Sequence, residues 1–497
     1  MTDAPLVAGD DLDAPLAWRN GHALTRRQYL ADVRALASAL PAAGPMFNVT
    51  ADRYRFAVGL GAALLRGQDN LLPPNHTPDT VARLLALFPT TYGLTDEAAS
   101  RVQLPMLRYP ADPARIDAPC AAVVPRIASD ALAARVLTSG STGAPVPHAK
   151  RWGLLVRNAQ AGARRLARQM GRTTLDGVTL VATVPAQHMY GFESSVLVAL
   201  LGGAAFDAGR PFFPADIVAA LARAARPRVL VTTPFHLKML LDAGLDLPQL
   251  DLTLCATAPL APQLAARAEA ALGAPLMEIY GCTEAGQVAS RRTTDGPEWQ
   301  VYDGLVLSGD GAHTLVQGGH VPEPTPLADV LDVVDAQTFR LLGRSNDLIN
   351  IAGKRSSLSH LNHHLNSVEG VHDGAFWLPA QDGAHIGGSV ARLVAFVVAP
   401  GVPAALLHEQ VLRALRERLD AAFLPRRIVA VPTLPREPTG KLPAEAFKVW
   451  AEQALRDFPT PAGVTIGVTI GVTIGETIGV TIGATVDATI NAAVTPP

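Results

Sequence analysis

The chain has 497 residues, of which 48% are hydrophobic and 17% are charged, and this composition supports a large buried core and two or more domains. Its formal net charge of −2 gives no indication of a general affinity for nucleic acid. The three cysteines, Cys120, Cys255 and Cys282, lack metal-site spacing and fit a reducing compartment better than a disulfide-stabilised fold.

The first 13 residues are acidic and contain no apolar run, so no signal peptide is expected. No later stretch is long and apolar enough to span a bilayer. The sequence therefore predicts a cytoplasmic protein without stable membrane insertion.

The middle of the chain, from about residue 130 to residue 284, alternates short apolar runs with amphipathic stretches. Five runs are predicted as strands: Ala133–Leu137, Val178–Val184, Val229–Thr232, Leu252–Cys255 and Met277–Tyr280. An apolar helix is expected near Phe192–Leu201, and Pro234 begins another at its favoured first position. Such alternation indicates an α/β fold with mostly parallel sheets and packed helices, whose ligands bind at the carboxyl ends of strands.

A second pattern begins near residue 343. Leu393–Val398 and Ile428–Val431 are predicted as strands, and Ala404–Phe423 carries apolar residues at helical spacing. We therefore expect a large N-terminal domain over residues 1–343, a hinge at 344–347 and a small mobile α+β domain over 348–461.

Residues 462–497 form a tail built on repeats of Gly-Val-Thr-Ile. A four-residue period matches neither a helix nor one face of a strand. The tail is expected to be a poorly ordered, low-complexity appendage. A small β-solenoid or an aggregation-prone segment is the alternative.

The first motif with chemistry is a loop of small residues after a predicted strand: Thr138, Ser139, Gly140, Ser141, Thr142 and Gly143. Glycines let backbone amides approach an anion, and hydroxyls add donors to phosphate oxygens. The loop is not a Walker A motif, because no Gly-Lys-Ser/Thr follows. The alternative interpretation is a flexible surface turn.

The second motif is the segment Tyr280-Gly281-Cys282-Thr283-Glu284 at the end of an apolar run. A tyrosine stacks on a base, a threonine donates to phosphate, and a glutamate binds the Mg²⁺ that accompanies ATP. The alternative is a capping threonine and a solvated glutamate at the start of a helix.

Two further motifs follow near the C-terminus. Arg344, together with Asp329 upstream, is placed to hold ribose hydroxyls, and Lys441 on a Pro/Gly loop offers a mobile charge to a phosphate. The alternatives are a linker with ordinary surface charges and an ordinary surface lysine.

The order and spacing of these motifs resemble the adenylate-forming superfamily of acyl-CoA synthetases, peptide-synthetase adenylation domains and luciferases, over roughly residues 20–450. Thr138–Pro145 matches the phosphate loop of that family. Val146 stands where the family has a lysine, so the part of that lysine is missing or passes to Lys150.

The resemblance implies a role for each motif. It implies that Tyr280 and Gly281 belong to the ATP-binding residues, with Tyr280 stacked on adenine. It also implies phosphate contact by Thr283 and Mg²⁺ binding by Glu284. The other implied groups are an adenine-contact segment of Ala256, Thr257 and Ala258, a ribose pair of Asp329 and Arg344 with Asp332 as a competitor, a hinge at Asn346, a catalytic Lys441, and an acyl pocket of His188, Tyr190, Gly191 and Cys282. The alternative for His188 is a histidine of the core.

A narrower resemblance links the chain to acid-activating ligases of bacterial aryl-polyene and xanthomonadin pigment pathways. It is carried by three segments: Leu71–Asn75, Pro147–Trp152 and Ala352–Leu358. Common CoA ligases have Arg-Ile-x-Pro-x-Glu-Ile-Glu where this chain has Arg355-Ser-Ser-Leu-Ser-His-Leu-Asn362.

The implied activity uses ATP and Mg²⁺ to convert a carboxylic acid, aromatic and similar to hydroxybenzoate, into an acyl-adenylate. The acyl group then passes to the phosphopantetheine thiol of an acyl carrier protein. The alternative is a ligase that transfers the acyl group to free CoA. A catalytically weakened acyl or nucleotide sensor is a second alternative, and a P-loop kinase-like enzyme is disfavoured because the Walker lysine is absent.

Overall fold

The computed structural model describes residues 3–73, 75–98, 102–110, 123–139, 145–309, 313–344, 348–351, 354–379, 392–437 and 442–458. The chain divides into two units, Met1–Pro459 and Thr460–Pro497, and the second lies outside the described residues. Of the predicted site, Gly140, Ser141, Thr142, Gly143, Asn346 and Lys441 also lie outside them. Thr138, Ser139 and Arg344 are described in their backbone only.

An eleven-stranded mixed sheet carries most of the candidate site. Its strands, in spatial order, are β21 (Asp329–Val333), β22 (Thr338–Arg344), β17 (Glu298–Val301), β16 (Gly286–Arg292), β15 (Leu276–Cys282), β14 (Leu252–Cys255), β13 (Arg228–Thr232), β11 (Thr179–Ala182), β12 (Ala205–Asp207), β2 (Pro15–Arg19) and β3 (His22–Thr25). The strands from β15 to β2 run parallel to their neighbours. The strands beyond them pair antiparallel.

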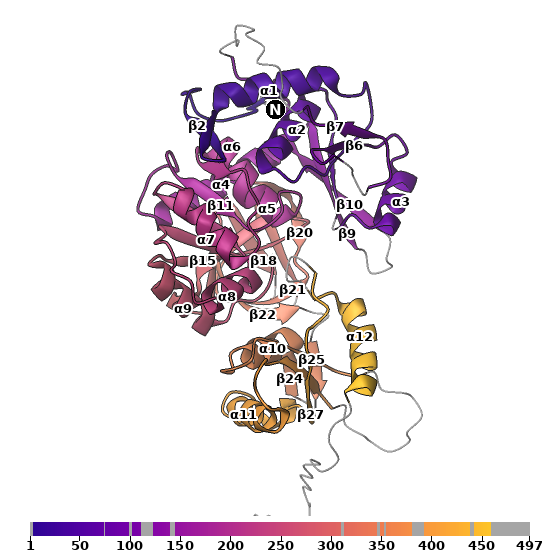
Figure 1. Ribbon diagram of the computed structural model, residues 1–497, viewed down its shortest axis with the longest axis vertical. Helices are drawn as coiled ribbons and strands as arrows, with labels where there is room; N and C mark the ends of the chain where they lie inside the picture. The colour runs from indigo at the N-terminus through magenta and orange to yellow at the C-terminus, as the bar shows by residue number, and fades with distance from the viewer. Residues whose placement is uncertain are drawn as a thin grey trace, which may run out of the picture. The chain divides into compact units, whose positions relative to one another are not determined.

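A six-stranded sheet contains the two strands that flank the predicted phosphate loop. Its order is β10 (Pro145–Arg151), β9 (Leu132–Ser139), β5 (Asn70–Leu72), β4 (Met46–Asn48), β6 (Tyr92–Thr95) and β7 (Met106–Arg108). β10 pairs antiparallel with β9, and Pro145 lies opposite Ser139. β9 and β10, the strands on either side of the glycine-rich loop in the sequence, are therefore antiparallel neighbours (Figure 1).

The remaining elements are short sheets and helices. The strands are β1 (Ala4–Pro5) with β8 (Arg126–Ile127); β18 (Leu305–Gly309), β19 (Thr314–Gly318) and β20 (Val321–Pro326); β23 (Leu348–Ile351) with β24 (Lys354–Ser357); and β25 (Asp373–Trp377), β26 (Val394–Val398) and β27 (Arg427–Ala430). The helices are α1 (Arg26–Ala39), α2 (Arg53–Leu65), α3 (Pro78–Leu87), α4 (Trp152–Gln169), α5 (Met189–Gly191), the π-helix η1 (Phe192–Leu197), α6 (Val198–Gly202), α7 (Pro214–Arg223), α8 (Pro234–Asp242), α9 (Pro262–Leu272), α10 (Leu358–Asn366), α11 (Ala404–Arg416), α12 (Ala444–Asp457), and the 3-10 turns η2 (Thr293–Asp295) and η4 (Ala421–Phe423). None of the helices in the described ranges has the length and apolar content needed to cross a membrane.

The parallel strands of the large sheet are buried on both faces. Val229 and Val231 of β13 join the hydrophobic cluster on one face, and Leu230 between them joins the cluster on the other. Helices α7, α8 and α9 supply apolar residues to that second cluster and pack along the same face (Figure 1). Burial on two faces explains why these strands are continuous apolar runs in the sequence.

The predicted α/β class is confirmed, and so are the main elements of the middle region. The five predicted strands correspond to β9, β11, β13, β14 and β15. Helix α8 begins at Pro234, and the Thr233 hydroxyl caps it by accepting from the His236 amide. The expected helix near residue 192 begins as the π-helix η1, and α6 continues it.

The C-terminal elements also form where expected, at β26, α11 and β27. Two hydrophobic clusters of the described chain draw only on residues between 349 and 454 and share no member with the clusters of the large sheets. The division into a large domain, a hinge and a mobile small domain stays a prediction, as does the character of the tail.

Candidate active site

Three predicted motifs lie at one edge of the large sheet. The segment with His188 follows β11, the segment with Thr257 follows β14, and the Thr283–Glu284 pair follows β15. These strands are parallel and belong to one run of neighbours, β11, β13, β14 and β15. Their carboxyl ends therefore meet at one edge, which is where such sheets bind ligands.

Thr283, Glu284 and Ala285 form a tight turn between β15 and β16, because Cys282 pairs with Gly286. The alternative reading of this motif as a helix start is wrong, and the strand pairing of β16 is the reason. The Glu284 side chain is 47% exposed and stands at the tip of the turn. No group of three or more His, Cys, Asp or Glu among the described residues is placed to hold a metal ion together. One exposed carboxylate fits Mg²⁺ that is carried mainly by phosphate oxygens.

Tyr280 connects the turn to the predicted ribose residues. Its hydroxyl donates to the Asp329 carboxylate at 2.7 Å. Asp329 of β21 lies directly opposite Arg344 of β22, and antiparallel partners bring their Cβ atoms to about 5 Å. The structure thus brings together Tyr280, Asp329 and the backbone of Arg344. Asp332, the competing carboxylate, pairs instead with Arg340 at 3.4 Å and is 50% exposed.

Thr257 has an unusual backbone. Its φ is +83°, a conformation that a β-branched residue adopts only under strain. Its hydroxyl oxygen is buried and has no hydrogen-bond partner among the described residues. Strain together with an unpaired buried hydroxyl makes Thr257 a candidate ligand contact, and the adenine-contact role of residues 256–258 stays a prediction.

The predicted acyl-pocket residues have different surroundings. His188 is partly exposed, and its Nδ1 accepts from the Tyr190 amide at 3.3 Å, so it caps the short helix α5. Tyr190 is buried, and its hydroxyl donates to the Leu254 carbonyl. A side chain at Gly191 would meet the Pro185 carbonyl at 2.0 Å. His188 is therefore the more exposed of the two side chains, and the acyl-pocket role of these residues stays a prediction.

Cys282 is the fourth predicted pocket residue. Burial raises the pKa of its thiol to about 12. The thiol therefore stays protonated at neutral pH and is suited to lining a pocket, not to acting as a nucleophile.

Lys150 reaches the Thr283–Glu284 turn from the other sheet. Its Nζ donates to the backbone carbonyls of Thr283 and, at 3.3 Å, of Glu284. Burial lowers the pKa of Lys150, against the opposing field of the buried Glu193. Two residues earlier on β10, His148 Nε2 lies 3.8 Å from Glu284 Oε1.

Glu193 and Asn158 were not singled out in the sequence. Glu193 is 3% exposed, and its carboxylate accepts from the Asn158 amide. A side chain at Gly286, whose φ is +80°, would come within 2.9 Å of both residues. An acidic residue inside the apolar run after Gly191 is the signal that marks Glu193.

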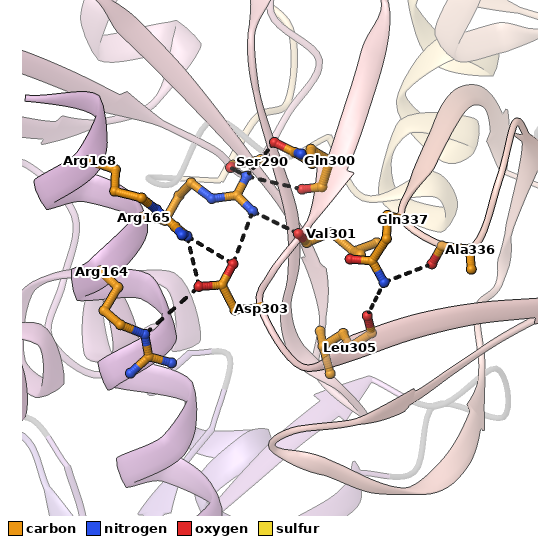
Figure 2. Close-up of polar contacts among 10 residues, drawn as sticks. All are labelled: Arg164, Arg165, Arg168, Ser290, Gln300, Val301, Asp303, Leu305, Ala336 and Gln337. Atoms are coloured by element: carbon orange, nitrogen blue, oxygen red, sulfur yellow. Dashed lines mark hydrogen bonds and ion pairs between the residues drawn. The ribbon is translucent and has the colours of Figure 1, made fainter. Parts of the chain in front are cut away.

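Helix α4 joins β10 to the large sheet. It begins at Trp152, directly after β10, and Arg165 donates to the Val301 carbonyl at 2.7 Å and to Ser290 Oγ at 3.0 Å. Figure 2 shows this contact beside the ion pairs of Arg164 and Arg168 with Asp303. The exposed pairs contribute little, whereas the mostly buried Arg165 fixes the helix in place.

Glu193 makes the stability of the protein pH-dependent. Burial raises its pKa from 4.5 to about 7, against the opposing fields of Lys150 and the hydrogen bond from Asn158. The folded state therefore binds the proton more tightly, so the contribution of Glu193 is present below pH 4.5 and lost as pH rises through 7. The loss amounts to about 3 kcal/mol. We expect Glu193→Gln to lose less stability than wild type between pH 5 and pH 8, measured as thermal midpoints. Equal losses in both proteins would contradict the shift.

Comparisons with known proteins indicate the family of this chain. The family model described as AMP-binding enzyme matches residues 58–326. A 4-coumarate–CoA ligase of Rhodobacter capsulatus is 30% identical over 304 residues, which cover 61% of this chain and 73% of the relative. A 4-coumarate–CoA ligase of Halorhodospira halophila is 31% identical over 319 residues, with the same two coverages of 61% and 73%.

The fold also matches that of a solved structure. An anthranilate CoA ligase in complex with anthranoyl-AMP superposes with a TM-score of 0.72 at 15% identity. The match covers 91% of this chain and 99% of the other.

Proposed function

The chain belongs to the AMP-binding enzyme family, and from that premise we propose that it activates an aromatic carboxylic acid and transfers it to the thiol of CoA. It is an AMP-forming acid–thiol ligase that uses ATP to make an acyl-adenylate. The observation that carries the proposal is the cluster at the carboxyl edge of the large sheet, where Tyr280, Asp329 and the Thr283–Glu284 turn come together. The aromatic substrate class is supported by the 4-coumarate–CoA ligases among the relatives.

In the first half-reaction the substrate carboxylate attacks the α-phosphate of ATP, and pyrophosphate leaves. Negative charge grows on the α-phosphate, and the Thr283 hydroxyl and Lys441 are assigned to stabilise it. Glu284 would hold Mg²⁺, which neutralises phosphate charge when bound. His188 is assigned to the carboxylate side of the pocket.

In the second half-reaction a thiol attacks the carbonyl of the adenylate, and AMP leaves. We assign the change between the two steps to rotation of the small domain about Asn346, so that Lys441 serves only the first step. Alternation of this kind builds two sites from one pair of domains.

A phosphopantetheine thiol on a carrier protein is the second candidate acceptor. It was the first expectation from the sequence, and the departure at residues 355–362 from the pattern of common CoA ligases supports it. The names of the curated relatives favour free CoA. The pigment-pathway resemblance and its hydroxybenzoate-like acid rest on the sequence alone.

A substrate screen tests the proposal. We expect 4-coumarate and hydroxybenzoates, but not fatty acids, to stimulate pyrophosphate release from ATP by at least about tenfold over the rate without acid. Mass spectrometry of reactions with CoA and with a phosphopantetheinylated carrier protein identifies the acceptor. Carboxylate-dependent pyrophosphate release excludes a non-catalytic sensor, and release of ADP in place of AMP would contradict adenylation.

A further inference from the structure

We propose that Lys150 is a positioning residue that holds the Thr283–Glu284 turn in the conformation that presents Thr283 and Glu284 to ATP. The contact itself is observed, and its effect on catalysis rests on the proposed function. Lys150 Nζ donates to two successive carbonyls of the turn, those of Thr283 and Glu284. An ammonium with two backbone acceptors fixes the peptide planes of both residues, and with them the directions of their side chains.

The contact joins the two large sheets of the protein. Lys150 belongs to β10 of the six-stranded sheet, whereas the turn connects β15 and β16 of the eleven-stranded sheet. β10 is also the strand that leaves the glycine-rich loop. Lys150 therefore connects β10, the strand that follows the phosphate loop, to the turn that carries the proposed Mg²⁺ ligand.

The turn is held from two sides. On one side, Lys150 donates to the backbone carbonyl of Glu284, and His148 lies beside the Glu284 carboxylate. Lys150 and His148 are two residues apart and so lie on the same face of β10. On the other side, a side chain at Gly286 would come within 2.9 Å of Asn158 and Glu193 and would need a φ of +80°. The buried Glu193, in its ionised form, also favours the charged form of the Lys150 ammonium.

Lys150 does not replace the lysine that the resemblance places at position 146. Val146 is 45% exposed near the start of β10, and four residues of extended chain separate it from Lys150 by about 13 Å. A lysine that moves with a loop and a partly buried lysine fixed to a turn have different functions. The role inferred for Lys150 is therefore static and differs from the part in loop closure that the sequence left open for it.

Hydrogen–deuterium exchange without substrates tests the contact directly. In Lys150→Met the amides of residues 282–286 should exchange faster than in wild type, because the turn loses two hydrogen bonds. Lys150→Arg, which keeps a cation and donors, should restore most of the protection. Lys238→Met, which breaks a surface ion pair with Asp242 on α8, is the matched control and should leave these amides unchanged.

Steady-state kinetics then test the consequence. Lys150→Met should lower kcat for acid-dependent pyrophosphate release by about 10- to 100-fold and raise the Mg²⁺ concentration for half-maximal rate, with the KM for the acid unchanged. Lys150→Arg should recover part of kcat. Wild-type kcat and Mg²⁺ dependence in Lys150→Met would overturn the positioning role.

A second variant, which removes the charges of both Lys150 and Glu193, tests the proposal if Lys150→Met alone fails to fold. Lys150→Met combined with Glu193→Gln leaves neither charge uncompensated, and it should show the same rise in exchange at residues 282–286. Unchanged exchange in a folded Lys150→Met or in this double variant overturns the proposal. Because exchange is measured without substrates, a wild-type protein that releases no pyrophosphate would contradict the proposed function while leaving this test intact.

Discussion

Replacing Lys441 by alanine is expected to abolish acid-dependent pyrophosphate release and to spare thioester formation from supplied acyl-adenylate. The α-phosphate gains negative charge only in the first half-reaction, and loss of one group that stabilises such charge costs about 100- to 1000-fold in rate. Both half-reactions are measured on the same preparation, the first by pyrophosphate release and the second by mass spectrometry of the thioester.

The matched control is Lys448→Ala, which removes an exposed lysine from α12 of the same C-terminal region and should leave both rates near wild type. Loss of both half-reactions in folded Lys441→Ala would contradict the assignment, since it would place Lys441 in a step common to both. An unchanged first half-reaction would remove Lys441 from the chemistry altogether.

The parallel part of the large sheet was predictable because its strands are buried on both faces. β14 forms over the same residues, Leu252–Cys255, that the apolar run predicted. The start of α8 followed from local chemistry, a capping threonine and a proline at the first helical position. Such signals lie within a few residues of each other, so a single sequence contains them.

Contacts between distant segments were not predictable. Lys150 and Thr283 lie 133 positions apart, on different sheets, and the sequence around neither residue indicates the contact. The turn at Thr283 was open to a helical reading, because its form depends on the pairing of β15 with β16. The role of Glu193 depends on burial among Asn158 and Gly286, which is a property of the packed π-helix.

Spacing assigned the ribose carboxylate to Asp329, with Asp332 as a near competitor. The register of β21 and β22 separates them, because it sets Asp329 against Arg344 and Asp332 against Arg340. The hydroxyl of Tyr280, a residue 49 positions upstream, donates to the Asp329 carboxylate. This contact depends on tertiary structure, and the predicted ribose role of Asp329 can be tested by a comparison of the two carboxylates.

Asp329→Ala is therefore expected to weaken ATP binding by about 10- to 100-fold, the range for hydrogen bonds to a charged group, whereas Asp332→Ala should leave it within about twofold. Tyr280→Phe keeps the ring beside Trp299 and Phe339 and loses only the hydroxyl, so its effect should be smaller, about three- to tenfold. Calorimetric titration of ATP without a carboxylic acid measures all three affinities in the absence of turnover. A larger loss in Asp332→Ala than in Asp329→Ala would transfer the ribose assignment to Asp332. Equal losses in Asp329→Ala and Tyr280→Phe would mean that the carboxylate acts by orienting the tyrosine, with no direct contact to the ribose.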